Sequence, residues 1–311
     1  MTIDIAIVPV AGHGTRLLPA TKSQPKEMLS VGRKPVVQYV VEELALSGIR
    51  RLLFITSHGK ASIEQHFDID EQLTTYLRET GREEQLLDLE FERREMEYFY
   101  TRQRRQLGLG HAVLCAKSLV GNQPFVVALG DSIIGLHAQS DIVARMIDQF
   151  DSSGADLVVA FERVPRDEVV HYGIARPRGA AGPIFELEDV VEKPSVEEAP
   201  SDLAVAARYV LTPAIFEALE QTPPGKGGEI QLTDAIRLLL RRGCRGLGVT
   251  LSGSERRFDI GNFDSYFRTF TEFALSDPQY GPALRAFVRQ WLDNEAGTGE
   301  AGTGEARTGE A

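Results

Sequence analysis

Short apolar runs that alternate with helical patterns are the feature of this sequence that most limits its fold. Two intervening segments, residues 35–46 and 142–150, carry apolar side chains at helical spacing. Because strands joined through helices pair in parallel and are covered on both faces, we predict an α/β, Rossmann-like fold with a mixed, mainly parallel central sheet and helices on both faces. The predicted buried strands are residues 3–10, 51–56, 125–129 and 156–161.

The second half of the chain has a looser pattern of Gly- and Pro-marked turns with short strands and later helices. Before it, residues 70–97 are rich in Glu, Arg and Leu and predict a polar helical excursion that leads to a strand ending near Gln103. We find no linker, so residues 1–294 are expected to form one domain. The predicted elements beyond Phe161 are strands at 172–175, 189–192 and 204–211 and helices at 228–241, after Asn262 and at 281–291.

The C-terminal segment, residues 295–311, repeats Gly, Thr, Glu and Ala with a period of five residues and has no apolar anchor. Such a segment cannot bury enough surface to offset the entropy of ordering, so we predict a disordered low-complexity tail. Even without this tail the chain is acidic, and its formal charge of -11 argues against a broad surface for nucleic acid.

The cysteine content and the hydropathy predict the cellular compartment of the protein. Cys115 and Cys244 are the two cysteines of the sequence and do not form a CxxC pair, which favours a reducing environment and argues against a structural zinc site. We see no leader-like N-terminus and no apolar run of about 18 residues. The sequence therefore predicts a cytoplasmic, soluble protein that does not enter a membrane.

A glycine loop directly after the first strand is the strongest sign of chemistry. Gly12 and Gly14 permit positive φ and let backbone N–H groups approach a phosphate or a base. A dinucleotide fingerprint would need a further glycine where Leu17 stands, and the phosphate-loop pattern ending in Gly-Lys-Ser or Gly-Lys-Thr is absent. Cations follow at Arg16, Lys22 and Lys26, so a triphosphate site and a solvated turn both remain open.

Several segments together resemble one family. AGHGTRLLPATKSQPKEML at residues 11–29 is similar to the signature loop of sugar-1-phosphate nucleotidylyltransferases, and its second half resembles bacterial UTP–glucose-1-phosphate uridylyltransferases. Four later segments agree in order and spacing, so the resemblance extends over about residues 3–275. These segments are KPVVQYVVEE at 34–43, GLGHAVLCAKSLVG at 108–121, VEKPSVEEAPSDLAVAARYVLTP at 191–213 and GGEIQLTDAI at 227–236.

The resemblance implies a nucleotidyltransferase fold of the glycosyltransferase-A-like type and a nucleotide site at its first loop. Arg16 and Lys26 would hold the β- and γ-phosphates as pyrophosphate leaves. A buried amide such as that of Gln103 can offer a donor and an acceptor to a pyrimidine. The residues that the resemblance assigns to the nucleotide are Ala11, Gly12, Gly14, Gln103 and Gly108.

The resemblance also implies a metal and a sugar-phosphate site, with residues 160–260 forming roughly the sugar-phosphate part. Asp131 and Asp259 would bind Mg²⁺, although helix capping is an alternative for either carboxylate. Glu192 and the backbone at Gly173 would contact sugar hydroxyls, and Lys193 would neutralise the attacking phosphate. An ordinary strand with a solvated ion pair is the alternative for this segment.

The implied reaction is the attack of glucose 1-phosphate on the α-phosphorus of UTP, giving UDP-glucose and pyrophosphate, with Arg16, Lys26 and Lys193 as catalytic residues. His13 and His111 are expected to be structural, because an anionic phosphate oxygen needs no general base. The family pattern is broken at His13, Ala207, Ser132 and FDIGNFDSYF, residues 258–267. These departures put the sugar choice and the role of Asp259 in doubt more than the reaction class.

Two other functions stay open on the sequence. A thymidylyltransferase that makes dTDP-glucose shares the loop, and a non-catalytic regulatory paralogue could bind nucleotide without turnover. The family's habit of forming homo-oligomers implies a dimer or tetramer, with residues 70–97 and 262–292 as the segments that would pack between subunits.

Overall fold

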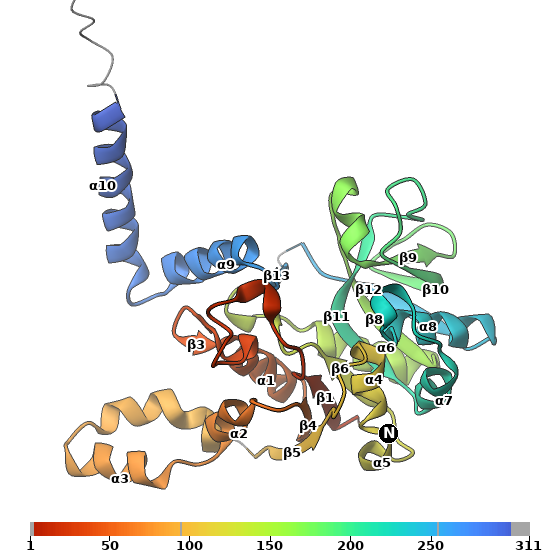
Figure 1. The fold of residues 1–311 in the computed structure, drawn as a ribbon, viewed down its shortest axis with the longest axis horizontal. Helices are drawn as coiled ribbons and strands as arrows, with labels where there is room; N and C mark the ends of the chain where they lie inside the picture. Colours follow the sequence, from red (N-terminus) through yellow and green to blue (C-terminus); the bar gives the residue numbers. More distant parts are fainter. Residues whose placement is uncertain (1–2, 94, 254, 300–311) are drawn as a thin grey trace, which may run out of the picture.

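The computed structural model of the protein describes residues 3–93, 95–253 and 255–299. These residues build a nine-stranded sheet in the order β5-β4-β1-β6-β11-β8-β12-β10-β9, with helices packed around it (Figure 1). The strands are β1 (Ile5–Pro9), β4 (Arg51–Thr56), β5 (Glu97–Arg102), β6 (Phe125–Ala128), β8 (Leu157–Arg163), β9 (Gly173–Pro177), β10 (Ile184–Glu192), β11 (Leu203–Leu211) and β12 (Gly246–Thr250).

The strand directions confirm the mixed sheet. Strands β5, β4, β1 and β6 pair in parallel, as do β8 and β12. Strand β11 is antiparallel to both β6 and β8, and β10 is antiparallel to both β12 and β9. The four-stranded parallel block β5-β4-β1-β6 thus corresponds to the regular first half of the sequence, and the sheet continues without a break into the second half.

Successive side chains of the central strands enter two different cores, which explains why these strands are apolar throughout. In β1, Ala6 and Val8 face one core, whereas Ile5 and Ile7 face the other. Side chains from α1 (Val36–Leu46) and α6 (Ile142–Ser153) complete the first core. Side chains from α4 (Leu109–Leu114), α7 (Ala214–Gln221) and α8 (Leu232–Arg241) complete the second, and the predicted helices on both faces are confirmed.

A fully buried ion pair links strand β11 to the helix layer. The Arg208 guanidinium donates to both carboxylate oxygens of Glu43 on α1, at 3.0 and 2.6 Å, and to the carbonyl of Ser132 at 3.0 Å. The register of β11 shifts between Val205 and Tyr209, and Ala207 within this bulge has a φ of 59°. The bulge therefore places Ala207 in the left-handed region that glycine adopts more easily.

Short elements complete the fold around the sheet. The polar excursion is helical at α3 (Glu71–Glu79) and in a 3-10 segment, η3 (Glu83–Arg93), and it extends sideways from the body (Figure 1). The remaining elements are α2 (Ala61–Phe67), α5 (Lys117–Val120), the strands β2 (Ser30–Val31), β3 (Lys34–Pro35), β7 (Ser132–Ile134) and β13 (Arg257–Asp259), and the 3-10 segments η1 (Thr15–Leu17), η2 (Lys26–Met28), η4 (Leu136–Ala138), η5 (Arg166–His171) and η6 (Lys226–Gly228).

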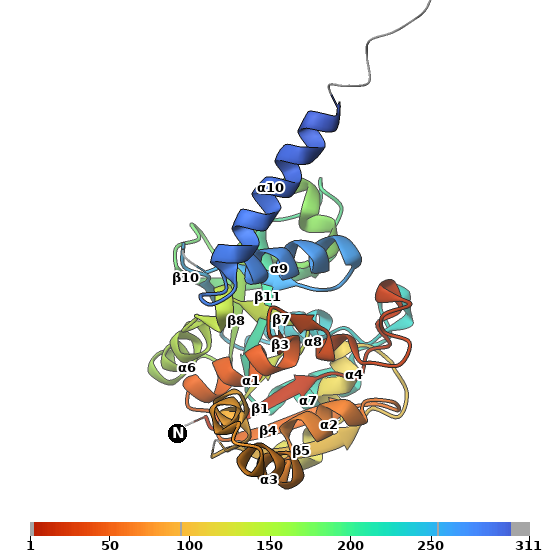
Figure 2. The same cartoon turned by 90° about the vertical axis from the view of Figure 1, so that its left-hand side faces the viewer.

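Of the two C-terminal helices, the first packs on the body of the fold and the second projects from it (Figure 2). Helix α9 (Phe263–Ser276) begins with a capping box between Asn262 and Ser265. Helix α10 (Gly281–Gly299) packs on α9 and then points away from the sheet in both views (Figure 2). Among the described helices, none combines the length and the low charge that crossing a bilayer requires.

Several predicted boundaries differ from the structure, and two of the differences have a clear physical reason. The helix expected from residue 228 begins at Leu232, because Gly227 and Gly228 have positive φ and Ile230 pairs its backbone with Leu107 and Gly110. Helix α10 includes residues 295–299, which were assigned to the disordered tail, since each residue added to an existing helix brings a further hydrogen bond. The rest of that tail, residues 300–311, lies outside the described residues.

Candidate active site

A cavity of about 570 Å³ opens where the first strands of the sheet end. Its lining includes every residue that the sequence assigned to a site except Asp259, whose neighbours Arg257 and Gly261 take part instead. Lys22 does not line it. The assigned residues that line the cavity are Ala11, Gly12, Gly14, Arg16, Lys26, Gln103, Gly108, Asp131, Gly173, Glu192 and Lys193.

The side chain of Lys26 crosses the backbone of the glycine loop that follows β1. Gly14 has a φ of 68°, and the Thr21 hydroxyl donates to its carbonyl at 2.8 Å. A Cβ built on Gly12 would lie 3.8 Å from Cε of Lys26, so the lysine side chain crosses the loop at that point. The loop conformation therefore requires glycine at residue 14 and places an ammonium group beside the loop's backbone.

Lys26 and Asp131 form an ion pair inside the cavity, with Nζ and Oδ2 2.5 Å apart. Burial lowers the pKa of Lys26, but Asp131 and Glu27 raise it more, and the net pKa lies above its ordinary value. Burial raises the pKa of Asp131, yet Lys26 lowers it more, so this carboxylate is held ionised. Both groups are thus charged before any ligand arrives.

Asp259 lies beside Asp131 because β13 pairs with β7, in a register that sets Asp259 opposite Ser132. Burial and the charge of Asp131 raise the pKa of Asp259. The Gly261 N–H donates to its Oδ1 at 2.8 Å, and a Cβ built on Gly261 would lie 3.4 Å from Nη2 of Arg16. The two aspartates, far apart in sequence, and Arg16 therefore lie close together, with Arg16 and Asp131 lining the cavity.

This carboxylate pair fits a magnesium ion. Mutual repulsion raises one pKa, and a cation between the two groups would relieve that repulsion. Within the described ranges, no cluster of three or more His, Cys, Asp or Glu side chains is suited to a metal ion. Mg²⁺ commonly takes one or two protein carboxylates and completes its octahedron with phosphate oxygens and water, so a pair suffices.

The opposite wall of the cavity comes from the hairpin of β9 and β10, where Glu192 stands opposite Gly173. A Cβ built on Gly173 would lie 3.3 Å from Oε2 of Glu192 and 3.2 Å from Oγ1 of Thr233, so a larger residue would crowd both groups. Lys193 has a φ of 45°, and its N–H donates to the carbonyl of Tyr172 at 2.9 Å. A lysine in this unfavourable backbone region is typical of a functional site.

The remaining wall is formed by the loop before α4 and a segment before α8. Gly108 has a φ of 98°, and a Cβ built there would lie 2.7 Å from Cβ of Glu229 and 2.8 Å from the carbonyl of Ile230. Gln103 is 4% exposed, and its Nε2 donates to the Gly108 carbonyl at 3.0 Å and to Nδ1 of His111 at 2.9 Å. Both amide hydrogens of Gln103 are thus used within the protein.

Several lining residues were not assigned from the sequence. The half-buried Arg257 contacts Oε1 of Glu162 at 2.5 Å and lies 4.5 Å from the ring centroid of Tyr172. Glu229, Gln231 and Thr233 also line the cavity. Glu229, Gln231 and Thr233 stand in GGEIQLTDAI, a segment that carried the resemblance, so their position in a shared motif was the available signal. Arg257 directly precedes FDIGNFDSYF, the segment in which the family pattern is broken, so no such signal was available for it.

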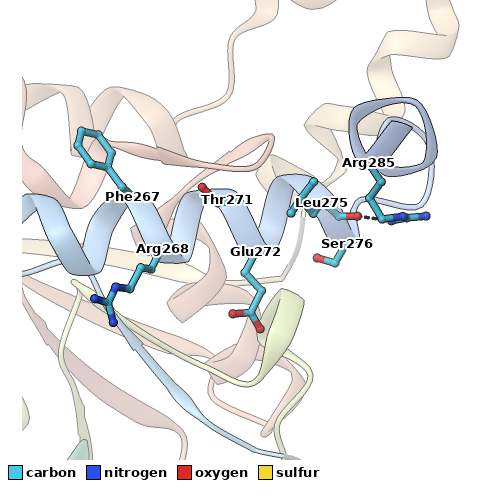
Figure 3. A pocket seen from close by; sticks show the side chains of 7 residues that line it. All are labelled: Phe267, Arg268, Thr271, Glu272, Leu275, Ser276 and Arg285. Carbon is cyan, nitrogen blue, oxygen red and sulfur yellow. Dashed lines mark hydrogen bonds between the residues drawn. The ribbon is translucent and has the colours of Figure 1, made fainter. Parts of the chain in front are cut away.

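A second hollow of about 680 Å³ lies between α9 and α10, away from these groups. Figure 3 shows its side chains on the two helices, where Arg285 of α10 donates to the carbonyl of Leu275. It contains none of the residues assigned to a site. It is lined by Phe267, Arg268, Thr271, Glu272, Leu275, Ser276 and Arg285.

Comparison with known proteins gives one consistent result. Residues 5–275 match the family model described as nucleotidyl transferase. The chain is 43% identical over 290 residues to UTP–glucose-1-phosphate uridylyltransferase YngB of Bacillus subtilis, covering 93% of this chain and 96% of that protein. It is 39% identical over 288 residues to a UTP–glucose-1-phosphate uridylyltransferase of Staphylococcus epidermidis, covering 93% and 98%.

Solved structures agree with these relatives. The UTP-bound UGPase of Acinetobacter baumannii superposes with a TM-score of 0.84 at 37% identity, covering 92% of this chain and 99% of that chain. A UDP-glucose pyrophosphorylase complexed with UDP-glucose superposes with a TM-score of 0.78 at 37% identity, covering 88% and 98%. The similarity therefore spans the cavity and the whole sheet.

Proposed function

The chain belongs to the nucleotidyl transferase family, and from this premise we propose that it transfers the uridylyl group of UTP to α-D-glucose 1-phosphate. The products are UDP-glucose and pyrophosphate. The observation that carries the proposal is the cavity itself, which gathers Arg16, Lys26 and Lys193 in one space, with Lys26 paired to Asp131 and a second carboxylate beside that pair. The names of relatives at 39–43% identity supply the uridine and the glucose.

The nucleotide would occupy the end of the cavity formed by the glycine loop and the loop before α4. Ala11, Gly12 and Gly14 would offer backbone to the nucleotide, and Gln103 and Gly108 would meet the uracil edge. Arg16 and Lys26 would hold the β- and γ-phosphates, because charge collects there as pyrophosphate leaves.

The sugar phosphate would approach from the wall of β9 and β10, in the part formed by about residues 160–260. Glu192 would accept hydrogen bonds from sugar hydroxyls, and Gly173, which also lines the cavity, would offer its backbone to a sugar hydroxyl. Lys193 would neutralise the attacking phosphate, which otherwise is repelled by the triphosphate. No general base is needed, because the attacking oxygen is already anionic.

Asp131 and Asp259 would hold Mg²⁺ at the phosphate end of the cavity. When bound, the ion supplies positive charge to the phosphate oxygens during in-line displacement. The protein's own contribution is to keep Asp131 ionised through Lys26 and to hold Asp259 through the Gly261 N–H. Catalysis then rests on positioning and charge stabilisation, with no covalent intermediate on the enzyme.

A substrate panel tests the proposal. Purified protein with Mg²⁺ is assayed for pyrophosphate release from UTP, dTTP, CTP and ATP, each with several sugar 1-phosphates. We expect the highest kcat/KM for UTP with glucose 1-phosphate. Preference for dTTP would identify a thymidylyltransferase, and UTP binding without turnover on the whole panel would identify a regulatory paralogue, the reading that the altered FDIGNFDSYF segment keeps open.

We also propose that the protein is a homo-oligomer that associates through α9 and α10. Helix α10 packs mainly on α9, and its outward face carries Phe287 and Trp291, exposed by 63% and 52%. Phe267 on α9 is 58% exposed at the edge of the second hollow. A stripe of large apolar side chains on a projecting helix is typical of a surface that a second copy covers. The expected cytoplasmic location stays a prediction.

A further inference from the structure

Gln103 offers the cavity an acceptor and no donor. Its Nε2 has two hydrogens, and both have partners within the protein, the carbonyl of Gly108 at 3.0 Å and Nδ1 of His111 at 2.9 Å. The described residues provide no hydrogen bond to its Oε1, and the side chain lines the cavity. This differs from the expectation that Gln103 supplies a donor and an acceptor to the base.

The Gly108 carbonyl determines which way the amide faces. A carbonyl can only accept, so the amide must turn its NH₂ group toward Gly108. If the amide were reversed, its oxygen would face the Gly108 oxygen at about the same distance. Gly108 itself is fixed, because it is packed against Glu229 and Ile230 and has a φ of 98°.

His111 is the second anchor of this amide. It lies on the first turn of α4, three residues after Gly108, and its Nδ1 accepts the remaining hydrogen of Gln103. Burial lowers the pKa of His111, which favours the neutral ring, and Nδ1 must carry the lone pair because Nε2 of Gln103 can only donate. The thiol of Cys115 lies 3.9 Å from the same nitrogen, one helical turn later.

We propose that His111 is a positioning residue for base selection: together with Gly108 it holds the Gln103 amide so that Oε1 alone meets the Watson–Crick edge of the pyrimidine. The inference rests on the proposed function, because it assumes that the base lies against Gln103. Uracil presents an N3–H donor to Oε1, whereas cytosine presents an N3 acceptor. The arrangement therefore accepts uracil and rejects cytosine.

The same chemistry limits what His111 can select. Thymine has the same N3–H as uracil, so this amide does not distinguish UTP from dTTP. A binding site whose polar groups form hydrogen bonds with the correct base strongly rejects a base that leaves those groups unpaired. A site that recognises only the shape of the base discriminates less. We therefore expect the wild-type protein to prefer UTP over CTP by about a hundredfold or more in kcat/KM.

The test compares two substitutions at His111. His111→Leu removes the acceptor, and His111→Asn retains an acceptor oxygen near the position of Nδ1. For His111→Leu we expect kcat/KM for UTP to fall about two- to tenfold, mainly through KM, since one anchoring hydrogen bond is lost. Gly108 then remains the one anchor of the amide, whose torsion is broad and twofold. The NH₂ group can therefore face the base in a fraction of the molecules, and the UTP/CTP ratio should fall by about threefold to fivefold.

The control and the outcomes separate selection from packing. His111→Asn should keep the UTP/CTP ratio within about twofold of wild type, and melting temperatures report folding of all three proteins. A His111→Leu protein that loses activity equally on both nucleotides would refute the proposal, as would a wild-type protein without preference for UTP. If the wild type turns over neither nucleotide, the proposed function fails, and the UTP/CTP ratio measured as binding by calorimetry on the same proteins decides the role of His111.

Discussion

Lys26 and Asp131 hold each other in place, and in the proposed reaction both would change partners. Without ligands, the ammonium and the carboxylate lie 2.5 Å apart and each keeps the other charged. A triphosphate offers Lys26 a stronger anion, and a divalent cation offers Asp131 a stronger positive charge. The ion pair therefore keeps both groups charged, and neither charge is left unpaired in the low-dielectric cavity.

Replacing Asp131 tests its place in the metal site. Asp131→Asn keeps the shape but removes the charge, so we expect Mg²⁺-dependent pyrophosphate release to fall by about a hundredfold or more. Circular dichroism should show that folding is preserved. Asp148→Asn on the exposed face of α6 is the matched control and should keep wild-type activity. Substantial activity in Asp131→Asn would remove Asp131 from the metal site.

Replacing Lys193 tests whether this side chain serves the sugar phosphate and not the nucleotide. Lys193→Gln keeps a polar side chain of similar length but cannot neutralise the sugar phosphate. We expect kcat/KM for glucose 1-phosphate to fall by about tenfold to a hundredfold, with KM for UTP within about threefold of wild type. Lys117→Gln, which breaks the exposed pair with Glu220, should change neither value. An equal loss for both substrates would contradict a role specific to the sugar phosphate.

Residue types at single positions were easier to assign from the sequence than their hydrogen bonds. Gly12, Lys26, Asp131 and Lys193 stand in motifs, and the structure brings them to one cavity. The direction of the Gln103 amide depends on Gly108 and His111 after the chain has turned, and no sequence pattern encodes it. Arg257 was missed because its contacts, Glu162 and Tyr172, come from two other elements.

At the scale of elements, strand β11 explains why the second half of the fold was harder to predict. It inserts between β6 and β8, which are consecutive strands of the predicted parallel series, and runs antiparallel to both. Strand β12 reads GLGVT and was not predicted at all, because two glycines weaken its apolar pattern. Periodicity identifies local elements, whereas this strand order depends on contacts between residues distant in sequence.

The buried pair of Arg208 and Glu43 should matter for stability because it links β11 to α1. Both side chains are fully buried, so Arg208→Met leaves an uncompensated carboxylate inside the protein. We expect the free energy of unfolding to fall by about 3–5 kcal/mol at pH 8. Arg163→Met, which breaks an exposed pair with Asp202, is the matched control and should cost less than about 1 kcal/mol.

The pH dependence of the stability lost in Arg208→Met tests whether the unpaired Glu43 carboxylate causes that loss. Burial raises the pKa of Glu43, and Arg208 lowers it in part, so the pKa rises further when the arginine is removed. A carboxyl whose pKa is raised by folding destabilises the protein above its unfolded-state pKa and ceases to do so below it. The penalty of Arg208→Met should therefore shrink from pH 8 to pH 5 in chemical denaturation. A penalty that does not change with pH would assign the loss to packing.

At the scale of the whole molecule, the acidic balance of the sequence does not prevent the binding of anions. The formal charge is -11, yet Arg16, Lys26 and Lys193 line one cavity. Local placement of a few cations therefore decides which anions the protein can bind, and the net charge bears on long-range attraction only. The α9–α10 surface differs from the cavity, because it exposes large apolar side chains such as Phe287 and Trp291 and includes none of those three cations.

The proposed assembly through the α9–α10 surface can be tested with the fluorescence of the single tryptophan. Trp291 is the one tryptophan of the sequence and lies on the exposed face of α10. If a second copy covers this face, light scattering should give a multiple of 34.3 kDa and Trp291 should emit at shorter wavelength than in the monomer. Phe287→Glu places a charge within the same stripe and should yield monomers with red-shifted emission, since a buried unpaired charge opposes association.

The control for this experiment is Leu46→Glu, which changes a leucine that is 76% exposed at the end of α1, outside the two C-terminal helices. It should leave the mass and the emission of Trp291 unchanged. A wild-type protein that scatters as a monomer at micromolar concentration would contradict the assembly. An oligomer that survives Phe287→Glu would place the interface elsewhere, for which the lateral excursion of α3 and η3 is the other segment indicated by the sequence. Because the cavity lies in the body of the fold and α10 projects from it, Phe287→Glu should also retain turnover, which separates assembly from catalysis.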